Sequence, residues 1–277
     1  MSAERIFSLA PLTVSGLSPP AIVAAASEAG YGHAGLRLHP ASPGEAQWPV
    51  IGDTPMRRET RARLRDTGVK VFDFDIIRLD AGIDPGRFMP VLETAAELGA
   101  RYGLVAIDGD DRAEMIDGFA RLSELGSPLG LAFGIEYMPW TGAKTIADAR
   151  RIVEEAGSGG VLIDAIHVDR SGGPAAGIAA MPADLIAYFQ ICDLPAERPA
   201  DVATMIYQAR NARLPPGEGG IDVAGMVRAL PPGLPISVEV PNTALAATMT
   251  ASAYARLMLD RTRAFLRAVE GGQPDAA

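Results

Sequence analysis

The sequence predicts one (β/α)₈ barrel, a TIM barrel of the α/β class, that spans residues 1–277 as a single domain. Three observations predict it. Strand-like apolar runs recur about every 30 residues, as expected for one strand, one crossover helix and two loops. Helix start and stop signals lie between these runs. The length of 277 residues is close to that of a typical barrel, and the apolar share of 48% suffices for a large core.

Short apolar runs are typical of strands that are buried on both faces of a parallel sheet. Eight such runs begin near Ile6, His33, Val69, Arg101, Gly130, Gly159, Ile186 and Pro235. Because each run is followed by a segment long enough for a helix, we expect parallel strands joined by crossover connections.

Capping residues and glycines mark the helices between the strands. Ser18 precedes two prolines and is predicted to cap a helix that Gly30 ends. Thr145 and Asp148 form a predicted capping box at the start of a helix that ends at Gly157. Similar signals predict helices over 84–99, 111–126 and 249–269.

The regular spacing fails once, between the seventh and eighth strands. The extra stretch, 194–220, contains Arg198, Arg210 and Arg213, followed by a proline- and glycine-rich run. In a barrel this loop lies at the carboxyl-terminal face of the strands, where active sites of this architecture occur. Residues 270–277 are expected to form a flexible tail.

Composition excludes several classes of function. A formal charge of −9 argues against a nucleic-acid or anionic-membrane surface, and the single Cys192 excludes an internal disulfide. Of the 25 basic residues only Lys70 and Lys144 are lysines, and neither is expected at the active face, which disfavours a Schiff-base aldolase. Three histidines are too few for a multi-histidine zinc cluster. Without a secretory signal or a membrane-length apolar run, a soluble cytoplasmic protein is expected.

A polar side chain lies near the carboxyl end of each of the last four strands. These residues are Glu136, Asp164, Gln190 and Glu239. Because such ends meet at one face of a barrel, the sequence predicts one oxygen-rich site for a single divalent cation. Mn²⁺ is the preferred ion, with Mg²⁺, Co²⁺ and Zn²⁺ as alternatives. Asp169 is an alternative to Asp164, and the alternative role for Gln190 is that of a hydrogen-bonded core amide.

Other residues complete the predicted pocket. His167 is a candidate catalytic residue because imidazole moves protons near neutral pH. Arg213 is a candidate partner for a phosphate or carboxylate of the substrate. Trp140 is expected to form a wall of the pocket, and His39 and Asp75 are weaker substrate-binding candidates.

The order of these residues resembles the xylose isomerase-like TIM-barrel superfamily of sugar phosphate isomerases and epimerases. The resemblance covers nearly the whole chain. It implies that Glu136, Asp164, Gln190 and Glu239 bind one divalent metal and that His167 lies beside it. Many epimerases of the superfamily have histidine where this chain has Gln190. Glutamine at this position is similar to the 3-dehydroshikimate dehydratases of the same superfamily.

The predicted function is metal-dependent isomerisation or epimerisation of a sugar or sugar phosphate through an enediolate. Glu136 and Glu239 would serve as the acid/base pair. The alternative is a lyase of the 3-dehydroshikimate or inosose dehydratase type, in which His167 protonates the leaving hydroxyl. A third hypothesis is a non-catalytic sugar-binding barrel. The expected partner is a small carbohydrate or keto-polyol, without nucleic acid or membrane, and the oligomeric state, including a homo-oligomer, stays open.

Overall fold

A computed structural model describes residues 5–40, 45 and 47–271. Within this part of the chain, parallel strands close into a barrel in which neighbours in sequence pair and β8 pairs with β1. The strands are β1 (Phe7–Leu9), β2 (His33–Arg37), β3 (Lys70–Leu79), β4 (Tyr102–Ile107), β5 (Ala132–Glu136), β6 (Gly160–Asp164), β7 (Ile186–Ile191) and β8 (Ile236–Val238). Each strand begins within two residues of its predicted start. The predicted (β/α)₈ fold is therefore confirmed.

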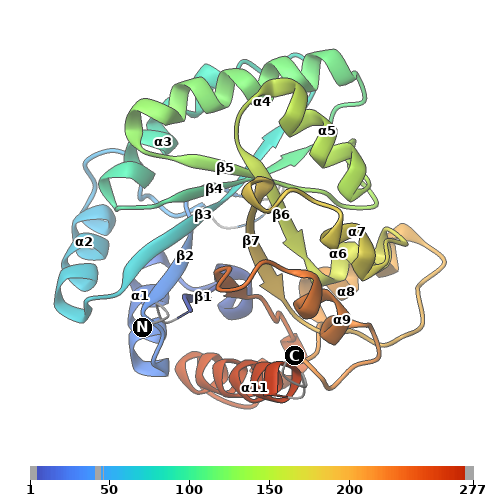
Figure 1. The fold of residues 1–277 in the computed structure, drawn as a ribbon. Helices are drawn as coiled ribbons and strands as arrows, with labels where there is room; N and C mark the ends of the chain where they lie inside the picture. The colour runs from blue at the N-terminus through green and yellow to red at the C-terminus, as the bar shows by residue number, and fades with distance from the viewer. Residues whose placement is uncertain (1–4, 41–44, 46, 272–277) are drawn as a thin grey trace.

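Helices surround the barrel, as Figure 1 shows. They are α1 (Pro19–Ala29), α2 (Pro55–Thr67), α3 (Met89–Glu97), α4 (Arg112–Gly126), α5 (Ile146–Ala156), α6 (Ala165–Arg170), α7 (Ala175–Ala179), α8 (Val202–Asn211), α9 (Val223–Ala229), α10 (Thr243–Ala246) and α11 (Ala251–Gly271). Short 3₁₀ turns cover Pro11–Val14, Pro85–Phe88, Ser127–Leu129 and Ala183–Leu185.

The helix ends follow the predicted capping chemistry with one exception. At the start of α5, the Thr145 hydroxyl accepts from the Asp148 amide at 3.2 Å, and the Asp148 carboxylate accepts from the Thr145 amide at 3.0 Å. Ser18 occupies the N-cap position of α1, but its side chain makes no capping hydrogen bond. Pro20 offers no amide hydrogen at the second helical position, and the Ala21 amide at the third position does not donate to the Ser18 side chain either.

Two segments differ from the sequence predictions. The insertion expected as a loop over 194–220 contains the helix α8, which brings Arg210 and Arg213 toward the barrel mouth. Glu270 and Gly271, which were expected in a flexible tail over 270–277, belong to α11, and Glu270 pairs with Arg5 at 2.5 Å. Residues 272–277 lie outside the described part of the chain.

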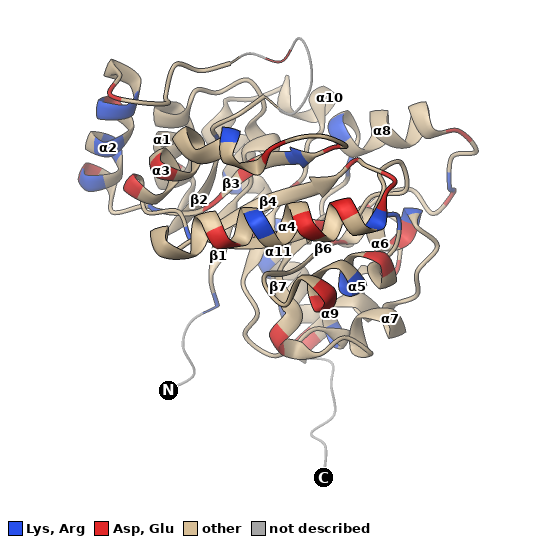
Figure 2. Cartoon of the chain, turned by 90° about the horizontal axis from the view of Figure 1, so that it is seen from above, with Lys and Arg blue, Asp and Glu red and all other residues tan. Residues whose placement is uncertain are grey.

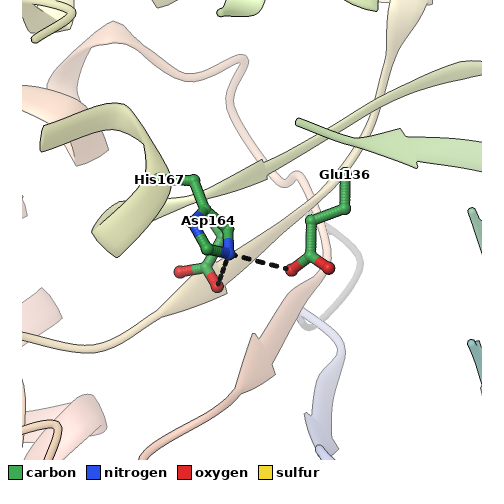
Figure 3. A group of neighbouring side chains, drawn as sticks. All are labelled: Glu136, Asp164 and His167. Atoms are coloured by element: carbon green, nitrogen blue, oxygen red, sulfur yellow. Dashed lines mark ion pairs between the residues drawn. The ribbon is translucent and has the colours of Figure 1, made fainter. Parts of the chain in front are cut away.

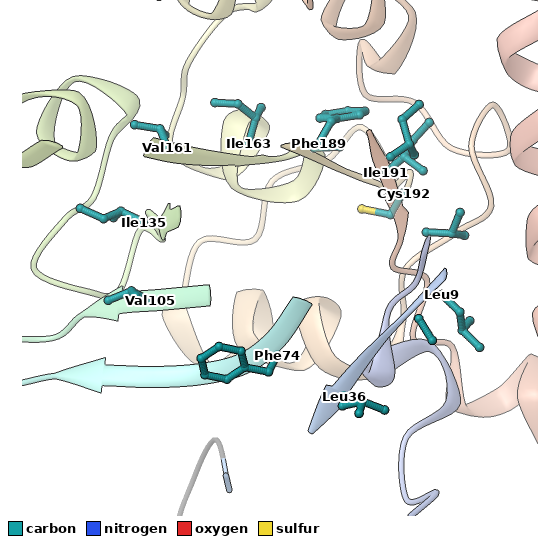
Figure 4. Packing of buried hydrophobic residues seen from close by; sticks show 14 of the residues in the cluster. Leu9, Leu36, Phe74, Val105, Ile135, Val161, Ile163, Phe189, Ile191 and Cys192 are labelled. Atoms are coloured by element: carbon teal, nitrogen blue, oxygen red, sulfur yellow. The ribbon is translucent and has the colours of Figure 1, made fainter. Parts of the chain in front are cut away.

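Apolar residues pack in two layers. The larger cluster lies between the strands and the helices, and Figure 4 shows Leu9, Ile163 and Phe189 among its members. The smaller cluster consists of side chains from β3, β4, β6 and β7 together with Met138, which lies just after β5. It fills the barrel interior. Its buried members are Phe72, Ile76, Leu104, Ala106, Met138, Leu162 and Tyr188. This interior cluster forms a packed floor beneath the carboxyl ends of the strands.

Charges of both signs share the outer helices. Figure 2 shows acidic and basic residues together on α2, α4 and α5, where pairs such as Arg150 and Glu154 lie 2.8 Å apart. None of the helices in the described residues is long and apolar enough to cross a membrane.

A glycine on β2 makes room for a carboxylate in the barrel. A Cβ atom at Gly35 would overlap Asp73 Oδ1 and would lie 2.8 Å from Pro11 Cδ. Gly35→Ala should therefore lower the free energy of unfolding by about 1–3 kcal/mol, as overpacking does. Gly32→Ala is the matched control, since a Cβ atom there meets no heavy atom within 4 Å. Equal denaturant midpoints for the two variants would contradict this assignment.

Candidate metal centre

Oxygen-bearing side chains meet at the carboxyl ends of β5 to β8. Glu136 and Asp164 are the last residues of β5 and β6, Gln190 lies in β7, and Glu239 follows β8. All four are buried, with exposed fractions of 0–5%. The strand register pairs Asp164 with Gln190, and Gln190 with Ser237, two residues before Glu239. The Gln190 amide donates to Glu239 Oε1 at 3.2 Å.

His167 joins this group from the short helix α6. Asp164 caps that helix by accepting from the Ile166 amide at 3.1 Å, so the first turn bends back over the strand end. His167 Nε2 lies 3.6 Å from Glu136 Oε1 and 3.8 Å from Asp164 Oδ2, as Figure 3 shows. One ligand atom from each of these three residues lies within 4.8 Å of the other two, a spacing that could hold a metal ion.

The donor set fits a divalent cation. Gln190 Oε1 is buried without a hydrogen-bond partner in the described part of the chain. A buried amide oxygen without a partner is costly, and a cation removes that cost. Carboxylate and amide oxygens suit Mg²⁺ and Mn²⁺, and a neighbouring imidazole also suits zinc.

Burial shifts the protonation of these groups in opposite directions. Burial, together with the charges of Glu239 and Asp164, raises the pKa of Glu136 well above its usual value. Burial raises the pKa of Glu239 to about 8, although Arg213 opposes the shift. Burial lowers the pKa of His167 to about 4, so its imidazole is neutral at pH 7 and can accept a proton. A bound cation would favour the ionised form of both glutamates.

Arg213 lies directly against two of the predicted metal ligands. Its Nη1 is 2.7 Å from Asp164 Oδ2, its Nη2 is 2.9 Å from Glu239 Oε2, and the residue is 2% exposed. The sequence predicts instead that this arginine faces a substrate anion. The contact of Arg213 with these two carboxylates cannot be predicted from the sequence, because Arg213 follows an inserted helix whose position depends on tertiary packing.

A cavity of about 370 Å³ opens beside these residues. Glu136, His167, Arg213 and Glu239 line it, and so do two of the predicted substrate-binding residues, Asp75 and Trp140. The Trp140 and His167 rings meet edge to face, with centroids 5.2 Å apart.

The cavity wall also contains three arginines that are not among the pocket residues predicted from the sequence. They are Arg37, Arg78 and Arg210. Arg37 Nη2 lies 3.1 Å from Asp75 Oδ2, and Arg78 Nη1 lies 2.8 Å from Asp108 Oδ2. A signal for Arg37 was present, because Arg37 ends β2 as Glu136 ends β5 and Asp164 ends β6.

Two other candidates lie elsewhere. His39 is absent from the described lining of the cavity, and its Nδ1 lies 3.0 Å from the Pro40 carbonyl oxygen while its ring packs against Phe88. Asp169, the alternative to Asp164, pairs with Arg198 at 3.2 Å on the exposed side of α6. The strand end thus directs Asp164 into the site, and the helix directs Asp169 away from it.

Two curated relatives are 3-dehydroshikimate dehydratases. The protein from Pseudomonas aeruginosa is 28% identical over 211 residues, which cover 70% of this chain and 33% of that protein. The protein from Pseudomonas putida is 26% identical over 212 residues, with the same two shares. The chain therefore spans about a third of the length of these relatives.

Solved structures share the fold. A fusion protein of a xylose isomerase-like TIM barrel and 4-hydroxyphenylpyruvate dioxygenase has a TM-score of 0.77 at 22% identity, covering 99% of this chain and 46% of that chain. The IOLI protein, whose structure contains a zinc atom, has a TM-score of 0.76 at 15% identity over 98% and 99% of the two chains. D-allulose 3-epimerase from Methylomonas sp. has a TM-score of 0.69 at 15% identity over 96% and 98%.

Residues 23–265 match the family described as xylose isomerase-like TIM barrels. Together with the closed eight-stranded barrel, this match identifies the chain as a member of the xylose isomerase-like TIM-barrel family.

Proposed function

We propose that the chain is a divalent-metal-dependent enzyme that removes a proton next to a carbonyl group of a small polyhydroxylated substrate. Within this class we favour dehydration of a cyclic keto acid of the 3-dehydroshikimate kind. One observation carries the proposal. Three buried carboxylates and the partnerless Gln190 Oε1 meet at the carboxyl ends of β5 to β8, and two of the carboxylates, Glu136 and Glu239, line a cavity there.

The proposed ligands are Glu136, Asp164, Gln190 and Glu239. When bound, a divalent cation would supply a Lewis acid that polarises the substrate carbonyl and makes the neighbouring proton more acidic. The zinc atom in the IOLI structure supports a metal in this family, while the preference for Mn²⁺ remains our proposal.

His167 is the proposed base. Burial lowers its pKa, which keeps the imidazole neutral at pH 7 but weakens it as a base, so Nε2 can accept the proton next to the carbonyl only when a bound cation makes that proton more acidic. The same nitrogen can then return that proton to the hydroxyl on the adjacent carbon, which leaves as water while a carbon–carbon double bond forms. The elimination is then balanced without a net gain or loss of protons.

Three features favour dehydration over isomerisation. The ligand set contains Gln190, as the resemblance to the dehydratases implies. Both curated relatives are named 3-dehydroshikimate dehydratase, although the chain spans only a third of their length. The cavity wall contains Arg37, Arg78 and Arg210, whose positive charges suit a substrate that carries a carboxylate.

Isomerisation or epimerisation is the second candidate. Glu136 ends β5 and Glu239 follows β8, three strands further round the barrel, so each can serve a different face of a substrate. That arrangement suits a two-base proton transfer, and a solved epimerase shares the fold.

A substrate comparison tests the proposal. The Mn²⁺-supplemented protein is incubated in deuterated water with 3-dehydroshikimate, an inosose, a ketose and a ketose phosphate. Dehydration predicts a conjugated product with new near-ultraviolet absorbance from a cyclic substrate. Deuterium incorporation with retention of all hydroxyl groups would favour the epimerase instead. Ligand binding without either change, in a protein that binds no cation, would indicate the non-catalytic barrel.

Glu239→Gln should reduce divalent-cation affinity more than about 100-fold, because it removes a charged ligand while keeping the shape of the side chain. Loss of a group that only hydrogen-bonds a metal ligand costs about 10–100-fold, so loss of the ligand's own charge should cost more. Calorimetric titration with Mn²⁺ measures the effect, and elemental analysis of the parent should give one ion per chain. Glu218→Gln is the control, since Glu218 pairs with Arg261 on the surface. Unchanged affinity in Glu239→Gln would refute the assigned ligand set.

His167→Asn should lower turnover by about 10²–10⁴-fold, the range of a lost general acid/base, and should leave cation affinity nearly unchanged. Steady-state rates and Mn²⁺ titration separate the two effects. A large loss of cation binding would instead make His167 a ligand together with Glu136 and Asp164. An unaltered rate would exclude His167 from the mechanism.

A further inference from the structure

Arg213 forms a bridge between two proposed metal ligands. Its guanidinium contacts Asp164 through Nη1 at 2.7 Å and Glu239 through Nη2 at 2.9 Å, and all three side chains are 0–5% exposed. The planar fork of arginine can hold two carboxylates in a fixed relative position.

The guanidinium is fixed from behind as well. Nε donates to the Ala209 carbonyl oxygen at 2.7 Å, which ties the side chain to α8. The main-chain amide of Arg213 donates to the Pro241 carbonyl at 3.0 Å, and Asn242 Nδ2 donates to the Arg213 carbonyl at 2.9 Å. The last two bonds join the inserted segment to the residues that follow Glu239. Arg213 is therefore held in place through both its side chain and its main chain.

A buried aspartate orders the chain that follows Arg213. Asp193 and Leu214 exchange two main-chain hydrogen bonds at 2.8 Å. The Asp193 carboxylate also accepts from the Gly217 amide at 2.9 Å, and a Cβ atom at Gly219 would overlap it. The glycine-rich run therefore wraps around Asp193 and holds Arg213 against the strand ends.

With its three carboxylates ionised, the centre reaches charge balance when a divalent cation is added. The three carboxylates carry three formal negative charges and Arg213 carries one positive charge, so a divalent cation brings this group to neutrality. Without a cation, the guanidinium is the positive group in hydrogen-bond contact with Asp164 and Glu239 among the described residues.

We infer that Arg213 is a built-in counter-ion of the metal centre, which holds Asp164 and Glu239 together before the cation binds. This inference rests on the proposed function, because it presumes a cation at these residues. It assigns Arg213 a positioning role toward the ligands rather than a contact with a substrate anion. The consequence is that the cation should stabilise the protein more when Arg213 is absent.

Arg213→Gln tests the inference through thermal unfolding, with and without a chelator, and with saturating Mn²⁺. In chelator, the midpoint should fall by on the order of 10 °C, because buried carboxylates lose their charged partner. Saturating Mn²⁺ should then raise the midpoint by more in Arg213→Gln than in the parent. Arg213→Lys keeps the charge but loses the fork, and its cation-induced shift should lie between the two, which keeps the test decisive if Arg213→Gln does not fold in chelator.

Arg170→Gln is the matched control. Arg170 is also a buried arginine in this region, but it contacts Asp169, Gln208 and the Pro195 carbonyl rather than the proposed ligands. Its loss should lower the midpoint equally with and without Mn²⁺. Equal cation-induced shifts in the parent and both Arg213 variants would overturn the counter-ion role while leaving the metal centre intact. A parent protein whose midpoint no divalent cation shifts would instead overturn the proposed metal centre, and this role with it.

Discussion

The burial of three carboxylates at one end of the barrel is the constraint on which the other features of the site depend. Glu136, Asp164 and Glu239 are nearly inaccessible to water, and each buried ion costs several kcal/mol unless it is paired. Three neighbouring groups reduce that cost. The Arg213 guanidinium pairs with Asp164, the Gln190 side-chain amide donates to Glu239, and the Ile166 main-chain amide donates to Asp164. These groups leave negative charge that a divalent cation can neutralise.

The barrel supplies a rigid base for this charged cluster. Beneath the site, Phe72 and Tyr188 pack edge to face with centroids 5.1 Å apart, and the Tyr188 hydroxyl donates to Asp73 at 2.6 Å. Strands β5 to β8 lie side by side in a fixed register, so the four proposed ligands are set by hydrogen-bonded main chain rather than by flexible loops. Such support is what a metal site needs if its ligands are to keep one geometry.

Much of the architecture is predictable because it rests on local signals. The strands are apolar runs with regular spacing, and Glu136 and Asp164 interrupt those runs at the point where each strand ends. Contacts that depend on tertiary packing are less predictable. The sequence gives no indication that α8 lies within 194–220 or that it brings Arg213 to Asp164. The end of β2 is a second example. His39 and Arg37 are two residues apart, and only the structure shows that Arg37 lines the cavity.

Anomalous diffraction from crystals grown with Mn²⁺ tests the central claim most directly. We expect one anomalous peak per chain, at about 2.0–2.6 Å from oxygen atoms of Glu136, Asp164, Gln190 and Glu239, the distances typical of a hard cation. A peak held by Glu136, Asp164 and His167 without Gln190 and Glu239 would contradict the proposed ligand set. The absence of any peak at the barrel mouth would contradict the metal centre itself.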